Sequence, residues 1–313
     1  MRIGVATPIV TAHPATSRPW ETTAGPDDLR RIARAADDLG YDHLGCSEHV
    51  AVPVAAGTER GTVYFDPVAT LSHLAATTTR IRLATLVVVL GYHHPLEIAK
   101  RYGTLDVLSG GRVVLGVGVG SLREEFDLLG AEFAGRGDRA DDALRALHAS
   151  FGTPRPRYDG THYSFADMEV RPHSAGAVPI WVGGRTLRSL RRAVDLGNGW
   201  VPFALSADET STLLAKVETP PDFEVVLSCT VDPVREPDRT RTALDRLRDT
   251  GATVAKTSVI ADDPAGFVDA LVALRELAEP MGIAFAPAGG EVPPASRTTA
   301  SRASDPRTEG APA

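Results

Sequence analysis

The sequence predicts a (β/α)8 TIM barrel, in which eight parallel strands close into a ring and helices cover the outside. Segments typical of strands alternate with segments typical of helices along most of the 313 residues. The strand segments are continuous apolar runs, which indicates burial on both faces and therefore a parallel sheet covered by helices. Eight such strands close most naturally into a barrel, and a doubly wound open sheet is the alternative.

The predicted strands are short apolar runs, several of which end in glycine or in polar residues. They cover residues 2–9, 40–50, 80–90, 111–120, 178–184, 199–203, 224–231 and 254–260. The predicted helices carry apolar residues at helical spacing, as at Phe267, Leu271 and Leu274. They cover residues 26–40, a segment that begins at Asp66 and Pro67, and residues 95–111, 122–130, 139–151, 185–197, 206–217, 239–251 and 263–282.

Two segments fall outside this alternation. Residues 155–174 carry a turn signal at Asp159 and Gly160, and they predict a short hairpin insertion between the fourth and fifth strands. From about Pro287 the chain consists of Pro, Ala, Ser, Thr, Gly and scattered charges, a composition that does not bury a core. We therefore expect one barrel domain over residues 1–286 and a disordered C-terminal tail over residues 287–313.

Composition excludes several classes of function. The 33 basic and 40 acidic residues give a net charge of −7, and no basic patch is interleaved with aromatics, so a nucleic-acid partner is not expected. The longest apolar stretch, residues 81–92, is interrupted by Arg82 and is too short to span a bilayer. The first residues lack the pattern of a signal peptide. Cys46 and Cys229 lie in apolar surroundings, which favours buried reduced thiols and a cytoplasmic protein.

The strand ends carry the residues that suggest chemistry. In a barrel, the active site lies where the C-terminal ends of the strands meet. The second strand ends in Ser47, Glu48 and His49, and the third ends near His93 and His94. Glu48 and His49 are therefore candidate catalytic residues, although a pair that caps the next segment is an alternative. The three histidines lack the spacing of a metal site and no thiolates join them, so no metal is expected.

Glycines mark two further strand ends. Gly116, Gly118 and Gly120 share one face of the fourth strand, where either a flat ligand or close packing excludes side chains. Their spacing lacks the third glycine of a dinucleotide fingerprint. No GxSxG segment is present, which disfavours an elbow-type hydrolase.

The fifth strand ends in Gly183 and Gly184, directly before Arg185, Thr186 and Ser189 at the start of a helix. Free backbone N–H groups, two hydroxyls and a guanidinium suit a phosphate group. A plain glycine turn with a threonine cap is the alternative at this position.

The residues quoted above resemble the luciferase-like monooxygenase superfamily. The similarity is carried by residues 80–130, with the pattern HP…A…LD.LS.GR…G.G.G, by residues 178–203 and by residues 40–50. It runs in order over roughly residues 1–285. Members of this superfamily are (β/α)8 barrels of the bacterial-luciferase type that bind flavin mononucleotide (FMN) or the 5-deazaflavin coenzyme F420.

The resemblance implies roles for particular residues. Glu48 and His49 match an acid–histidine pair that faces the tricyclic ring, with the histidine exchanging a proton near the reacting carbon. Glu48 is expected to orient His49 or to contact the polar edge of the ring. Leu86 and Val87 match the position of a non-prolyl cis peptide that backs the ring, and Gly118 belongs to the same cofactor-binding set. The matching phosphate site comprises Gly184, Arg185, Thr186 and Ser189.

The resemblance is stronger to the F420-dependent actinobacterial branch than to the flavin luciferases. The flavin luciferases carry an arginine for phosphate near the end of the fourth strand, where this sequence has Val119. We therefore expect an F420-dependent oxidoreductase that moves a hydride between the deazaflavin and a small organic substrate. The alternatives are a reduced-FMN-dependent monooxygenase and a non-catalytic cofactor-binding barrel. The identity of the substrate and the oligomeric state, a homodimer included, stay open.

Overall fold

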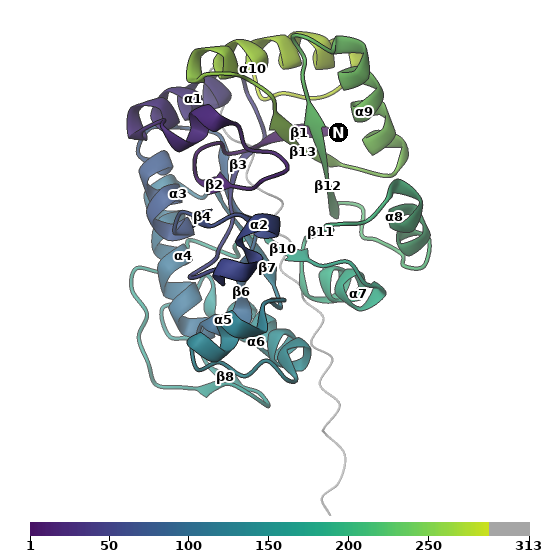
Figure 1. Ribbon diagram of the computed structural model, residues 1–313. Coiled ribbons are helices and arrows are strands. Elements are labelled where there is room, and N and C mark those ends of the chain that lie inside the picture. The colour runs from purple at the N-terminus through teal and green to yellow at the C-terminus, as the bar shows by residue number, and fades with distance from the viewer. Residues whose placement is uncertain (288–313) are drawn as a thin grey trace, which may run out of the picture.

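The computed structural model describes residues 1–287 and contains a closed parallel barrel at its centre (Figure 1). The strand order is β1-β3-β5-β7-β10-β11-β12-β13, and parallel pairing of β13 with β1 closes the ring. The barrel strands are β1 (Arg2–Ala6), β3 (His43–Cys46), β5 (Arg82–Thr85), β7 (Val113–Gly118), β10 (Ile180–Gly183), β11 (Gly199–Val201), β12 (Glu224–Val231) and β13 (Val254–Val259). The predicted barrel is thus confirmed and the open sheet is wrong. The predicted tail disorder concerns residues that, except Pro287, lie outside the described part.

The helices follow the strands and surround the barrel (Figure 1). The long ones are α1 (Pro26–Asp38), α3 (Pro67–Ala75), α4 (Pro95–Ser109), α6 (Arg136–Ser150), α7 (Leu187–Leu196), α8 (Ala207–Leu214), α9 (Pro237–Asp249) and α10 (Pro264–Ala278). Capping residues near in the sequence explain where two of these helices begin. Asp66 and Asp263 cap α3 and α10 by accepting from backbone N–H groups three residues on, and a proline occupies the first turn of each.

Short elements lie in the loops between these units. They are α2 (Gly57–Arg60), α5 (Arg123–Leu128), the antiparallel pair β2 (Thr11–Ala12) and β4 (Val63–Tyr64), the strand β6 (Val88–Val89), and 3-10 turns at Pro19–Thr22, Val54–Ala56, Leu90–Tyr92 and Glu279–Met281. The predicted hairpin is confirmed, with β8 (Tyr158–Asp159) paired antiparallel to β9 (Ser164–Phe165). Its turn is anchored because Asp142 on α6 accepts from the backbone N–H groups of residues 162 and 163.

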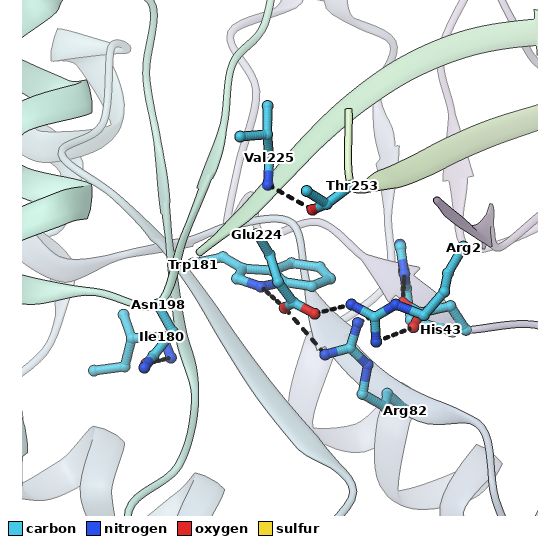
Figure 2. A network of polar contacts seen from close by, with 10 residues as sticks. Arg2, His43, Arg82, Ile180, Trp181, Asn198, Glu224, Val225 and Thr253 are labelled. Atoms are coloured by element: carbon cyan, nitrogen blue, oxygen red, sulfur yellow. Dashed lines mark hydrogen bonds and ion pairs between the residues drawn. The ribbon is translucent and has the colours of Figure 1, made fainter. Parts of the chain in front are cut away.

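The N-terminal end of the barrel is closed by charged side chains that pair with one another (Figure 2). Arg82 contacts Asp42 at 2.5 Å and Glu224 at 3.1 Å, and Arg2 contacts the same two carboxylates. Trp181 donates its indole N–H to Glu224 at 2.6 Å. Burial by itself raises the pKa of the Asp42 carboxyl, but Arg82, His43 and Arg2 together outweigh it, so that this pKa lies far below its usual range. The network therefore stays charged and seals this end.

A small apolar layer covers the network inside the barrel, while the larger core lies between the strands and the helices. The inner layer consists of Ala84, Val114, Trp181, Val201, Val226 and Val254, with Leu86 packed against it. This end of the barrel is thus filled, and a cavity lies at the opposite, C-terminal end. Cys46 and Cys229 are free thiols, as predicted, and burial raises the pKa of each to about 12. No helix within residues 1–287 is long and apolar enough to cross a membrane.

Candidate active site

A cavity of about 970 Å³ opens at the C-terminal ends of the barrel strands. Its size lies at the upper end of the range for cofactor and substrate pockets. Thr7, Ser47 and Leu86 line it where β1, β3 and β5 end, and Tyr64 and Phe203 line it from loops. The Thr7 hydroxyl is buried and has no hydrogen-bond partner among the described residues. An unsatisfied polar atom in the wall suits a ligand with polar edges, as flavins and deazaflavins have.

The peptide bond between Leu86 and Val87 is cis, as the family resemblance predicted. Three hydrogen bonds from β3 and the loop after it hold this segment. Leu86 N donates to the carbonyl of Cys46 at 2.7 Å, the Ser47 hydroxyl donates to the carbonyl of Leu86 at 2.7 Å, and Glu48 N donates to the carbonyl of Val87 at 3.4 Å. Leu86 itself lines the cavity. The end of β5 is thus a fixed backbone wall.

The glycines of β7 and β10 make room for the Val87 side chain. A Cβ atom added to Gly118 would lie 2.8 Å from Val87, and one added to Gly183 would lie 3.2 Å from it. At Gly116 an added Cβ would lie 1.9 Å from the carbonyl oxygen of Thr85. Close packing, one of the two explanations for these glycines, is therefore right. A contact of Gly118 with a cofactor stays a prediction.

His49 is held by a carboxylate, but not by the one next to it in the sequence. The Nδ1 atom of His49 lies 2.8 Å from Oε2 of Glu125 on α5. Glu48 turns away: it accepts from Val89 N at 2.7 Å and lies 2.8 Å from Nε2 of His93. The expectation that Glu48 orients His49 is therefore wrong, because each carboxylate has a different histidine as its partner. Contact between Glu48 and a ring edge stays a prediction.

Glu125 is buried and accepts four hydrogen bonds. Besides His49, its donors are the Tyr92 hydroxyl at 2.8 Å and the backbone N–H groups of Val50 at 2.5 Å and Ala51 at 3.2 Å. Burial raises the pKa of this carboxyl, but the hydrogen bonds outweigh it, and the pKa lies below its usual value. Because an ionised carboxylate only accepts, Nδ1 of His49 carries a proton, which leaves Nε2 to exchange one.

The second carboxylate–histidine pair has a different character. Burial lowers the pKa of His93, but its hydrogen bond to Glu48 and the charges of Glu48 and Glu97 together outweigh burial, and the pKa is raised. His94, by contrast, caps α4 by accepting from Leu96 N at 3.2 Å. Of the two histidines at the end of the third predicted strand, His93 is thus the partner of Glu48 and His94 caps the helix, and neither lines the cavity.

His49 does not line the cavity itself, but it packs against an aromatic residue that does. The ring of Tyr64, which lines the cavity, packs edge-on against the His49 ring with 4.5 Å between centroids. The Tyr64 hydroxyl donates to the carbonyl of Arg60 at 2.6 Å. Tyr64 therefore connects His49 with the cavity wall, and it lies on the same connection between β3 and α3 as the short helix α2.

The predicted phosphate segment is only partly available for a ligand. Thr186 caps α7 by accepting from Ser189 N at 3.2 Å, and the Ser189 hydroxyl donates to the carbonyl of Thr186 at 2.7 Å. Gly184 is close-packed, since an added Cβ would lie 2.5 Å from the Cβ of Ser189. Arg185 is exposed and lies over the Phe203 ring at 5.8 Å. The threonine-cap alternative thus accounts for both hydroxyls, and phosphate binding by Arg185 stays a prediction.

Comparison with known proteins agrees with this architecture. The family model described as luciferase-like monooxygenase matches residues 1–281. The chain is 35% identical over 154 residues to a 4-hydroxyprotoasukamycin monooxygenase of Streptomyces nodosus subsp. asukaensis, which covers 48% of the chain and 40% of that protein. It is 29% identical over 181 residues to an F420-dependent glucose-6-phosphate dehydrogenase of Microbacterium testaceum, which covers 56% of the chain and 52% of that protein.

A solved structure extends the comparison to the whole fold. A monooxygenase from Streptomyces bottropensis superposes with a TM-score of 0.74 at 22% identity, over 90% of this chain and 100% of that one. Relatives thus include both F420-dependent enzymes and monooxygenases.

Proposed function

Because the chain belongs to the luciferase-like monooxygenase family, we propose that it is an F420-dependent oxidoreductase acting on a small organic substrate. The observation that carries the proposal is the His49–Glu125 pair, which fixes one imidazole nitrogen and leaves the other, next to the cavity-lining Tyr64, to exchange a proton. F420, when bound, supplies a ring carbon that accepts or donates a hydride. The chain's own residues bind the cofactor and the substrate, orient them, and move the proton.

Residues around the cavity are suited to holding such a cofactor. The backbone at Leu86 and Val87 would support the flat ring, and the Thr7 hydroxyl would bond to a polar edge. Arg185 and the backbone at the start of α7 would bind the phosphate. Val119, partly buried at the end of β7, offers no charge to a flavin phosphate there, which favours F420 over FMN.

A reduced-FMN-dependent monooxygenase is the second candidate. The observation in its favour is the 35% identity to the Streptomyces nodosus monooxygenase, higher than the 29% identity to the F420-dependent dehydrogenase. A cofactor-binding barrel without turnover is the third. All three predict a bound tricyclic ring, so the cofactor and the turnover have to be measured separately.

Fluorescence titration with F420 and with FMN tests the proposal. We expect F420 to bind at least about tenfold more tightly, a difference of about 1.4 kcal/mol. Equal or reversed affinities would replace the F420 assignment with the monooxygenase. A substrate screen with the tighter cofactor then separates an enzyme from a barrel that only stores its ligand.

A further inference from the structure

One charged side chain of the barrel interior has no assigned role. Lys256 lies on β13, in register with Gly4 on β1 and Ser228 on β12. Val254, two residues earlier and hence on the same face of the strand, belongs to the layer inside the barrel. Lys256 therefore points into the barrel one layer above Val254, and it lines the cavity.

No hydrogen bond or ion pair links the Lys256 ammonium to any residue in the part of the chain that the structure describes. Burial lowers its pKa, with no carboxylate acting in the opposite direction. The N-terminal network shows the contrast, since there every arginine lies against a carboxylate. Lys256 is half-buried in the cavity wall, and a cation held there without an anion is unfavourable, so such a group is a candidate for ligand binding.

The charged residues in the cavity wall are mainly cationic. Among the described residues in its wall, Lys256, Arg239 and Arg246 are cationic and Glu21 is the acidic one. Arg239 is already paired with Glu236 at 2.9 Å, so Lys256 and Arg246 are the cations of this wall without a carboxylate partner in the described chain. Glu21 is already engaged, because its two oxygens accept from Ile9 N at 3.0 Å and Arg18 N at 2.7 Å. The protein carries a net charge of −7, yet its cavity is cationic. This is the electrostatic pattern of a site for an anion.

The side chains near Lys256 suit the same ligand. Ser228, Thr230 and Ser258 line the cavity on β12 and β13 and offer hydroxyl donors. The chain has three lysines among its 33 basic residues, and the other two, Lys100 and Lys216, are exposed. A lysine ammonium is compact and presents three donors, which suits a single oxyanion in a confined space.

We propose that Lys256 binds an oxyanion of the substrate, so that the substrate is an organic anion such as a carboxylate. This assignment rests on the proposed function, because it presumes that the cofactor and substrate share the cavity. The phosphate of the cofactor is expected at the end of β10, which β11 and β12 separate from β13. The anion at Lys256 is therefore a different one from the cofactor phosphate.

Nuclear magnetic resonance on the full chain with isotope-labelled lysine tests the proposal. The spectrum contains three lysine side chains, which Lys100→Arg and Lys216→Arg variants assign. We expect benzoate to shift the Lys256 signal and to raise its apparent pKa, while the uncharged benzyl alcohol leaves both unchanged. Formate, small enough to reach any open ammonium, serves as a second anion. If neither anion shifts the signal at millimolar concentration, or if benzyl alcohol shifts it equally, the proposal is wrong.

Calorimetry on variants measures the size of the effect. Lys256→Met keeps the length of the side chain without its charge, and Lys216→Met is the matched control on the surface. We expect Lys256→Met to weaken benzoate binding at least about tenfold, or about 1.4 kcal/mol, and the control to change nothing. Unchanged binding in Lys256→Met would overturn the proposal. Thermal unfolding of both variants shows whether the barrel is intact.

Two further titrations identify the source of the anion. If FMN shifts the Lys256 signal and riboflavin does not, the occupant is the cofactor phosphate and the substrate assignment is wrong. If neither F420 nor FMN binds the wild-type protein, the proposed function fails, while the anion titration still decides whether Lys256 is an oxyanion site.

Discussion

The two ends of the barrel use charged residues in opposite ways. At the N-terminal end, Arg2, Arg82, Asp42 and Glu224 form mutual ion pairs (Figure 2). At the C-terminal end, Lys256 and one nitrogen of His49 lack partners in the described chain. Groups that satisfy one another stabilise the fold, and groups left free at a cavity are available for a ligand. The division matches the location of active sites in barrels generally.

The largest expected effect is at the N-terminal end. Arg82→Met leaves two buried carboxylates with one cation fewer, and the free energy of unfolding should fall by about 3–5 kcal/mol. Chemical denaturation measures it. Arg101→Met is the matched control, since its pair with Glu97 lies on the surface and contributes at most about 1 kcal/mol. If Arg82→Met is as mild as the control, the N-terminal network does not stabilise the barrel.

At the C-terminal end, His49→Ala should lower turnover about 100-fold or more, because a positioned proton-transfer group is lost. Cofactor affinity should stay nearly the same, since Leu86, Val87 and Arg185 are untouched. Steady-state kinetics and fluorescence titration measure the two quantities. His94→Ala, which alters a helix cap, is the control. Full turnover in His49→Ala would make His49 a structural residue.

Glu125→Gln tests whether the buried carboxylate acts through His49. The amide keeps the volume but places a donor among four donors, so the His49 proton is no longer fixed on Nδ1. We expect turnover to drop about 10- to 100-fold. The double variant with His49→Ala should be no slower than His49→Ala alone, because the two residues act as a unit. Glu124→Gln is the control, since Glu124 is the exposed neighbour of Glu125 on α5. Additive losses would separate the roles.

The smallest expected effects distinguish two residues of the predicted phosphate segment, Arg185 and Thr186. Arg185→Ala should raise the cofactor dissociation constant about tenfold or more, as expected for a lost charge-assisted contact of about 1.5–3 kcal/mol. Thr186→Ala should leave that constant unchanged and lower the free energy of unfolding by about 1 kcal/mol, because Thr186 caps α7. The reverse pattern would return the phosphate site to the threonine hydroxyl.

The sequence by itself determined the barrel and the locations of its strand ends. Eight continuous apolar strands require burial on both faces, and Asp66 and Asp263 specify their helix starts through contacts three residues away. Such features depend on neighbours in the chain. Resemblance to known proteins, rather than local chemistry, predicted the cis bond between Leu86 and Val87.

Only the tertiary structure decided which side chains are partners. His49 pairs with Glu125, 76 residues away, although Glu48 is adjacent, because successive residues after a strand point in different directions. The sequence offered one sign of the role of Glu125, because this acidic residue stands beside the apolar Phe126 in a short helix, and both are buried. Lys256 occupies an unremarkable strand position, and its isolation became visible only when closure of the barrel brought Gly4 and Ser228, rather than a carboxylate, beside it. Pairing between distant residues depends on the closed barrel, since each strand faces neighbours that the chain order does not specify.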